Sequence, residues 1–195
     1  MSALPKLKLT ALEYLAIERG AEFKSEFFRG EMFAMAGVSR QHNRVKENLI
    51  IEIGGRIKGG RCQTYSSDQR VLVDHTGLYT YPDIVVLCGR GEFDPDDPDT
   101  LVNPTAIVEV LSPSTGKYDR WAKFRNYQQI PSLIEYVLVA QDEALIDRYV
   151  RQADGAWALV SFVGPEATLA FHCVPVTIPL TDVYAGVDFP EPAGH

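Results

Sequence analysis

The spacing of apolar residues predicts a long amphipathic helix in the segment 39–58. In this segment the apolar residues recur every four positions, at Val45, Leu49, Ile53 and Ile57. Such a stripe is typical of a helix that buries one face against a core. A shorter helix is predicted to begin at Thr10, because Thr10 and Glu13 have the spacing of a capping box.

Apolar runs and turn residues predict a series of strands around these helices. A hairpin is predicted to turn at Arg29-Gly30, and the polar, Pro-rich segment 89–104 is predicted to be a loop. The predicted strands are 62–66, 69–74, 79–88, 105–111, 135–140, 144–151 and 156–164, followed by short β pieces. The order of elements predicts an α/β fold with a mixed sheet flanked by helices and a β-rich C-terminal extension, since a regular βαβ alternation is missing.

A further helix is predicted over 118–129, where Pro131 ends it. Lys123 lies four residues after Asp119 and four before Tyr127, so these three side chains share one face of the helix. Trp121 and Phe124 lie off this stripe and are expected to pack toward the sheet.

The length of 195 residues predicts a single domain over 1–188, with a disordered Pro- and Gly-containing tail over 189–195. Three isolated cysteines, Cys62, Cys88 and Cys173, argue against a disulfide framework and indicate a reducing cytoplasm. No run of about 18 apolar residues occurs, so no membrane span is expected. The N-terminus also lacks the pattern of a secretory signal.

The charge of the chain disfavours a nucleic-acid partner. The formal net charge is −7, from 26 acidic and 19 basic residues, whereas phosphate binding normally relies on Lys and Arg. Much of the acidic excess is local, because five acids lie between Glu92 and Asp99, and basic residues cluster at 56–61 and 117–125. The charge therefore lowers the expectation of nucleic-acid binding without removing it.

Two carboxylates stand where a buried strand normally carries an aliphatic residue. Asp83 follows Pro82 at the start of an apolar run, and Glu109 lies inside Ala106-Ile-Val-Glu-Val-Leu111. A carboxylate in so apolar a strand costs several kcal/mol unless it is paired or bound to metal. A structural ion pair is the alternative for Glu109, and a turn is the alternative for Asp83. With Lys123 nearby, the pair could hold a hard divalent cation and polarise a water molecule.

Longer motifs around these residues resemble a known family. GEMFAMAG, His42, YTYPDIVV and IVEVLSPSTGKYDRWAKFRNY followed by PSLIEYVLV resemble the Uma-two family of predicted restriction endonucleases, within the PD-(D/E)XK nuclease superfamily. The resemblance covers roughly residues 9–151. The chain departs from the superfamily pattern at Leu111, where a lysine is usual. Lys123 on the following helix is the natural replacement, and Lys117 is its rival.

The resemblance implies an enzyme, a metal-dependent endonuclease that hydrolyses DNA phosphodiester bonds. Asp83 and Glu109 would hold Mg²⁺ or Mn²⁺, with the carbonyl of Val110 as a third ligand. Lys123 would orient the attacking water or stabilise charge on the phosphate. His42 and Asp119 are the supporting residues, and a homodimer is expected by analogy with other enzymes of this fold.

Two other functions stay open at this stage. The domain could be a catalytically silent nucleic-acid-binding or interaction module on the same fold, which the acidic composition favours. The carboxylate pair could instead serve a hydrolase that does not act on nucleic acid, such as a glycosidase.

Overall fold

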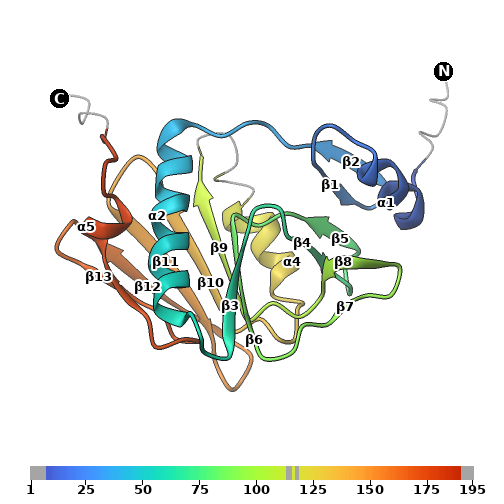
Figure 1. The fold of residues 1–195 in the computed structure, drawn as a ribbon. Helices are drawn as coiled ribbons and strands as arrows, with labels where there is room; N and C mark the ends of the chain where they lie inside the picture. The colour runs from blue at the N-terminus through green and yellow to red at the C-terminus, as the bar shows by residue number, and fades with distance from the viewer. Residues whose placement is uncertain (1–7, 113–115, 117–118, 190–195) are drawn as a thin grey trace.

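The computed structural model describes residues 8–112, 116 and 119–189. Two six-stranded open sheets form the body of the protein, with few helices around them (Figure 1). The first sheet has the order β12-β11-β10-β9-β6-β3 and is antiparallel except for the parallel pair β9–β10. The second has the order β2-β1-β5-β4-β8-β7, in which β4 and β8 are parallel.

The elements have the following bounds. The strands of the first sheet are β3 Cys62–Ser66, β6 Ile84–Cys88, β9 Ala106–Leu111, β10 Glu135–Ala140, β11 Leu145–Arg151 and β12 Trp157–Val163. Those of the second are β1 Ser25–Phe28, β2 Glu31–Ala34, β4 Arg70–Val73, β5 Leu78–Thr80, β7 Phe93–Asp94 and β8 Asp97–Leu101. A two-stranded ribbon comprises β13 Thr168–Ala170 and β14 Thr177–Pro179. The helical elements are α1 Ala11–Arg19, α2 Arg40–Ile57, the π-helical turn η1 Asp119–Lys123, α4 Phe124–Tyr127 and α5 Leu180–Val183.

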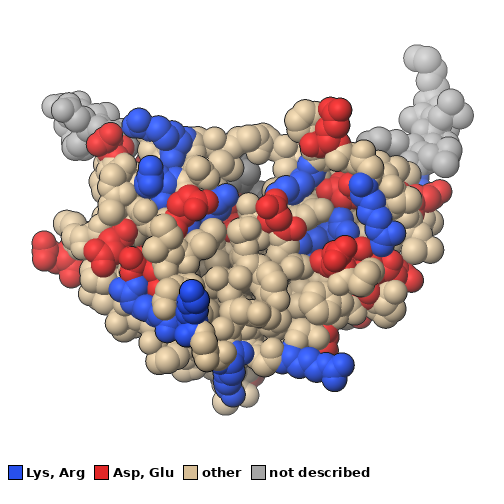
Figure 2. All heavy atoms as spheres, viewed as in Figure 1, with Lys and Arg blue, Asp and Glu red and all other residues tan. Residues whose placement is uncertain are grey.

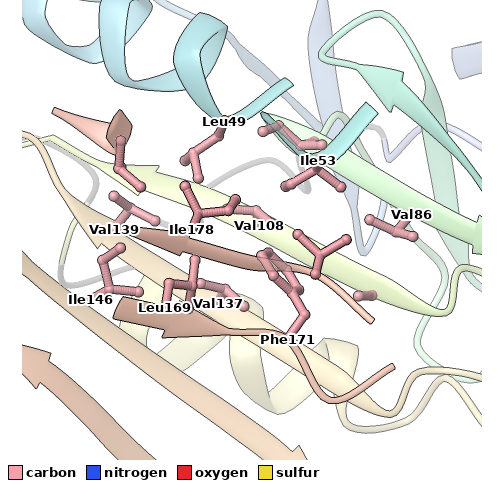
Figure 3. Close-up of a cluster of buried hydrophobic side chains, with 14 of the residues drawn as sticks. Leu49, Ile53, Val86, Val108, Val137, Val139, Ile146, Leu169, Phe171 and Ile178 are labelled. Atoms are coloured by element: carbon pink, nitrogen blue, oxygen red, sulfur yellow. The ribbon is translucent and has the colours of Figure 1, made fainter. Parts of the chain in front are cut away.

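The two faces of the first sheet are buried by different elements. On one face, α2 and the β13–β14 ribbon pack against alternate residues of the strands (Figure 3). Leu49 and Ile53 of α2 and Ile178 of the ribbon belong to the same buried cluster as Val108 and Val137 of the sheet. On the other face, α4 and the loop after it pack against the intervening strand residues, with Tyr127, Ile130 and Leu133 meeting Ile107 and Leu138. Successive strand residues point to opposite faces. Glu109 therefore shares the face of Ile107, toward α4.

The sequence-based predictions of the long helix and of most strands are confirmed. The helix α2 covers 40–57 against the predicted 39–58, and β10 has the predicted bounds 135–140. The run 79–88 is two strands, β5 and β6, that join different sheets, and the interruption falls at Pro82, which lacks a backbone N–H for a ladder. The loop predicted over 89–104 was wrong, because it contains β7 and β8.

The helix predicted over 118–129 is a π-helical turn followed by one α-helical turn. Phe124 packs toward the sheet as predicted, stacked on Tyr136 with ring centroids 5.2 Å apart. The prediction for Trp121 was wrong, since its side chain is 72% exposed. Trp121 lies two residues from both Asp119 and Lys123, which are buried, and residues two apart point to different sides of a helix.

The cysteine prediction was also wrong, because Cys62 and Cys88 form a disulfide. The two residues face each other across the antiparallel pair β3–β6 although 26 positions separate them. The cysteine content therefore gives no support to a reducing compartment. None of the helices in the described part of the chain has the length and apolarity needed to cross a membrane. The predicted tail over 189–195 falls outside the described residues except for Phe189.

The packing of α2 on the first sheet gives a test of the fold. We expect Ile53→Ala to lower the free energy of unfolding by about 2–5 kcal/mol, because Ile53 is fully buried and its truncation leaves a cavity. Ile51 on the same helix is 65% exposed, so Ile51→Ala is the matched control and should change stability by less than about 0.5 kcal/mol. Urea denaturation measures both variants, and equal effects would contradict this packing.

Candidate active site

Glu109 lies at the centre of a polar cluster inside the first sheet. Its side chain is almost fully buried, and both carboxylate oxygens accept hydrogen bonds. The Oε1 atom accepts from Lys123 Nζ at 3.1 Å and from the Tyr127 hydroxyl at 2.9 Å. The Oε2 atom accepts from the backbone N–H of Asp83 at 3.2 Å. The strand thus tolerates this carboxylate because three donors satisfy it.

Asp83 stands directly beside Glu109, between β5 and β6. Its Oδ2 accepts a hydrogen bond from the backbone N–H of Val110 at 2.8 Å and lies 3.2 Å from His42 Nε2. The backbone N–H of Asp83 thus donates to the Glu109 carboxylate, and the backbone N–H of Val110, next to Glu109, donates to the Asp83 carboxylate. No described residue donates a hydrogen bond to Oδ1 of Asp83, and the side chain keeps 14% exposure. This oxygen is the one that remains available to a ligand.

Lys123 lies among three carboxylates that come from three different elements. Its Nζ is 3.1 Å from Glu109 on β9, 3.0 Å from Glu26 on β1 and 3.5 Å from Asp119 on η1. The structure therefore brings Lys123 to the carboxylate pair predicted from the sequence. The rival, Lys117, lies outside the described residues.

Glu26 is a member of this cluster that the sequence analysis missed. It is buried, contacts Lys123 and accepts a hydrogen bond from the Thr80 hydroxyl at 2.5 Å. The available signal was an acid beside the apolar pair Phe27-Phe28 in a predicted strand. It resembles the signal that singled out Glu109, but the same hairpin also carries Glu31, and its short strands do not show which acid faces inward.

His42 lies in the first turn of α2, where Ser39 caps the helix by accepting the backbone N–H of His42 at 3.0 Å. The imidazole is buried, with Nε2 toward Asp83. Its Nδ1 is buried and has no hydrogen-bond partner among the described residues. The structure thus brings His42 to the site, in contact with Asp83 rather than with Glu109.

Asp119 lies at the start of η1, and its Oδ1 is 3.5 Å from the Lys123 ammonium. Its contact with Lys123 has the i,i+4 spacing predicted from the sequence. The backbone carbonyl of Asp119 also accepts a hydrogen bond from the Tyr136 hydroxyl at 3.1 Å, which ties the turn to β10. The structure therefore brings Asp119 into contact with Lys123.

The buried cluster shifts the protonation of its members. Burial raises the pKa of Glu109 above its ordinary value of 4.5; Lys123 opposes this shift, and Asp119 and Asp83 reinforce it. Burial opposes the charged form of Lys123, but Glu109, Glu26 and Asp119 outweigh burial and hold the pKa of Lys123 well above its ordinary value. Lys123 is therefore an ammonium throughout the physiological pH range and cannot act as a general base.

A cavity of about 430 Å³ opens onto these groups. Its polar lining is the cluster itself, including Asp83, Glu109 and Lys123. Its apolar lining comes from the segment 33–38, FAMAGV, which leaves β2 and runs to α2. In Figure 1 this connection crosses above the end of β9, between the hairpin and the long helix. We call residues 33–38 the apolar strap.

The donors in the cavity suit a hard divalent cation. Carboxylate oxygens of Asp83 and Glu109 are the ligands such ions prefer, and Mg²⁺ commonly uses only one or two carboxylates and keeps several waters. The described residues contain no group of three or more His, Cys, Asp or Glu side chains placed to enclose an ion. The arrangement therefore fits an open site with bound water and does not fit a closed structural site.

Comparison with known proteins gives the class and then the family. The fold is that of a protein from Anabaena variabilis described as a "putative nuclease", with a TM-score of 0.71, 18% identity, and coverage of 89% of this chain and 96% of that chain. The chain thus shares the mixed α/β fold of that protein. It belongs to the Uma2 family, described as "Putative restriction endonuclease", whose model matches residues 11–181.

Two relatives are uncharacterised proteins of Synechocystis sp. The protein slr1290 is 34% identical over 188 residues, which covers 95% of this chain and 96% of the relative. The protein sll1609 is 36% identical over 167 residues, which covers 84% of this chain and 92% of the relative. These matches extend over most of the chain. The family model confirms the resemblance drawn from the motifs.

The raised pKa of Glu109 predicts how stability depends on pH. Because burial raises the pKa of Glu109 in the folded protein, the unfolded chain releases this proton at a lower pH than the folded protein does, so the free energy of unfolding falls as pH rises above about 4.5. We expect Glu109→Gln to remove up to about 1.4 kcal/mol per pH unit of this slope. Urea denaturation between pH 5 and 7, in a chelator, measures it.

The control for this experiment is Glu22→Gln, because Glu22 is exposed and lies outside the cluster. This variant should keep the wild-type slope. If the stability of Glu109→Gln has the same pH dependence as that of the wild type, the raised pKa of Glu109 is contradicted.

Proposed function

We propose that this protein is a divalent-metal-dependent endonuclease that hydrolyses DNA phosphodiester bonds. One observation carries the proposal: Asp83 and Glu109 lie side by side at a cavity, with the Lys123 ammonium 3.1 Å from Glu109. Two acidic groups and one fixed cation are the components that phosphodiester hydrolysis requires. The family and the fold support a nuclease in general, and the cluster is our reason for assigning the reaction to these residues.

Asp83 and Glu109 would hold Mg²⁺ or Mn²⁺, with the carbonyl of Val110 as the predicted third ligand. When bound, such an ion lowers the pKa of its water and polarises the scissile phosphate. Oδ1 of Asp83 is the oxygen with no competing hydrogen bond among the described residues, so it is the natural first ligand. Glu109 would give up its proton on binding the ion, which makes metal affinity rise with pH.

Lys123 would stabilise negative charge that develops on the phosphate. Its raised pKa keeps it charged, and its three carboxylate neighbours fix its position before substrate arrives. A preorganised charge of this kind is effective because little reorganisation is needed during the reaction. His42, held at Asp83, would contact the phosphate or the attacking water. DNA is the expected partner of this activity.

The activity has a direct test. We expect Mg²⁺- or Mn²⁺-dependent cleavage of plasmid or single-stranded DNA at low salt. Asp83→Ala should abolish it, because the metal site loses a ligand. Lys123→Ala should lower the rate about 100- to 1,000-fold, the usual effect of removing one electrostatic donor. Isothermal titration with Mn²⁺ should show weaker binding to Asp83→Asn, which reports the metal site independently of cleavage.

The control variant is Asp99→Ala, since Asp99 is exposed and does not line the cavity. It should retain wild-type cleavage and metal binding. If only Asp83→Ala loses cleavage, the result supports a nuclease in which Lys123 has no catalytic role. Equal traces of cleavage in all variants would indicate a contaminating nuclease. The protein would then be better explained as a nucleic-acid-binding module without catalytic activity.

A homodimer is the second part of the proposal, and the edge of the first sheet supports it. The strand β12, WALVSFV, carries no charge and lies at the open end of the sheet. Its side chains Leu159, Val160 and Val163 are 51%, 42% and 71% exposed. An exposed apolar edge strand is a template for pairing. Two copies paired antiparallel about Val160 would place no like charges opposite each other.

Substitution at this edge tests the dimer. We expect Val160→Lys to convert a dimer to a monomer, because a lysine on an edge strand opposes further pairing. Ile51→Lys, at another exposed apolar position, should leave the dimer intact. Sedimentation velocity distinguishes the two outcomes, and a wild-type monomer at micromolar concentration would refute this interface.

A further inference from the structure

We propose, building on the nuclease function above, that the apolar strap is a platform for an unpaired base. The substrate class of the site is then single-stranded or locally unpaired DNA, and intact duplex is a poor substrate. Phe33 is the residue that stacks on the base. The proposal rests on the position of Phe33, the size of the cavity and the charge of its mouth.

Phe33 is an exposed aromatic side chain at the site. It is 49% exposed, it lines the cavity, and Val38 at the other end of the strap is 53% exposed. Phe33 on β2 is the direct cross-strand partner of Glu26 on β1. Directly opposed residues of an antiparallel pair point to the same face. The ring therefore stands beside the carboxylate that contacts Lys123, one side chain away from the proposed phosphate position.

The cavity is too small to admit a double helix. A volume of about 430 Å³ lies in the range of about 300–1,000 Å³ that takes one small ligand. Glu109 and Lys123 at its base are almost fully buried. A phosphate that reaches them brings its nucleotide to the cavity that Phe33 lines. A base can stack on Phe33 only if it is free of its own stack, so a nucleotide in a duplex must first unpair and unstack.

The charge of the cavity mouth also disfavours a duplex. The strap contains no Lys or Arg, and the chain carries a net charge of −7. In Figure 2 basic and acidic side chains alternate over the visible face and form no continuous basic field. Duplex binding depends mainly on phosphate neutralisation by basic residues. Stacking of a base on an aromatic ring contributes about 1–3 kcal/mol without any such charge. Stacking is thus a binding term that the described part of this mouth provides.

The proposal has a binding test that does not depend on cleavage. Fluorescence anisotropy with a labelled 20-nucleotide single strand and the matching duplex, in a chelator and at low salt, should show tighter binding of the single strand. We expect Phe33→Ala to weaken single-strand binding about 5- to 150-fold and to leave duplex binding unchanged. Phe33→Trp should retain the affinity, because another aromatic ring replaces the first.

Phe23→Ala is the matched control, since Phe23 is 76% exposed and does not line the cavity. It should bind both DNAs like the wild type. Equal weakening of single-strand binding in both Phe→Ala variants, or unchanged binding in Phe33→Ala, would overturn the platform. Tighter Phe33-dependent binding of the same RNA sequence would overturn the assignment to DNA.

Cleavage rates on the two DNAs separate this inference from the nuclease proposal. Faster cutting of the single strand, lost in Phe33→Ala, supports both. Efficient cutting of duplex that is insensitive to Phe33→Ala keeps the nuclease and refutes the platform. If single-strand binding depends on Phe33 but no metal-dependent cleavage occurs, the stacking role of Phe33 is supported and the nuclease proposal is refuted. The test concerns one site in one chain, so it does not depend on the dimer.

Discussion

The buried ammonium of Lys123 is the interaction on which the arrangement of the site depends. A charge that has lost water is tolerated only where opposite charges and hydrogen bonds replace it. Here the replacements come from Glu26 on β1, Glu109 on β9 and Asp119 on η1. One side chain thus fixes the hairpin, the central strand and the turn relative to one another. Removing the lysine would leave three buried or nearly buried carboxylates facing each other, so its structural and proposed catalytic roles are physically linked.

The π-helical turn explains how a lysine from another element reaches a strand carboxylate. The turn covers Asp119–Lys123 and is followed at once by the α-helical turn Phe124–Tyr127. π-Helical turns often occur at functional sites, because the wider turn redirects side chains. Lys123 and Tyr127 both reach the same oxygen, Oε1 of Glu109. The π-helical turn and the α-helical turn after it therefore provide one donor each, where the superfamily pattern would have a lysine on the strand itself.

The sequence predicted the parts of the site that have a local signal. Glu109 was found because a single strand of apolar residues shows which position is out of place. Lys123 came from the family resemblance, because an Asp–Lys pair on a helix is usually a solvated surface pair. Glu26 and the disulfide between Cys62 and Cys88 depend on which residues face each other across strands. That information lies in the register of the sheets, and the spacing of residues along the chain does not contain it.

For the proposed nuclease activity, the acidic composition of the chain presents an electrostatic difficulty that the site geometry resolves. Long-range attraction between DNA and basic residues gives most DNA-binding proteins their non-specific affinity. A net charge of −7 weakens that attraction for any DNA, and most strongly for a duplex, which carries the highest charge density. A substrate must then gain its affinity inside the cavity, from Lys123, from the proposed metal and from contact with the apolar strap. Only a strand that can insert a nucleotide obtains all three contributions. The net negative charge, taken alone, disfavours binding to nucleic acid. In combination with the cavity it would instead discriminate against intact duplex.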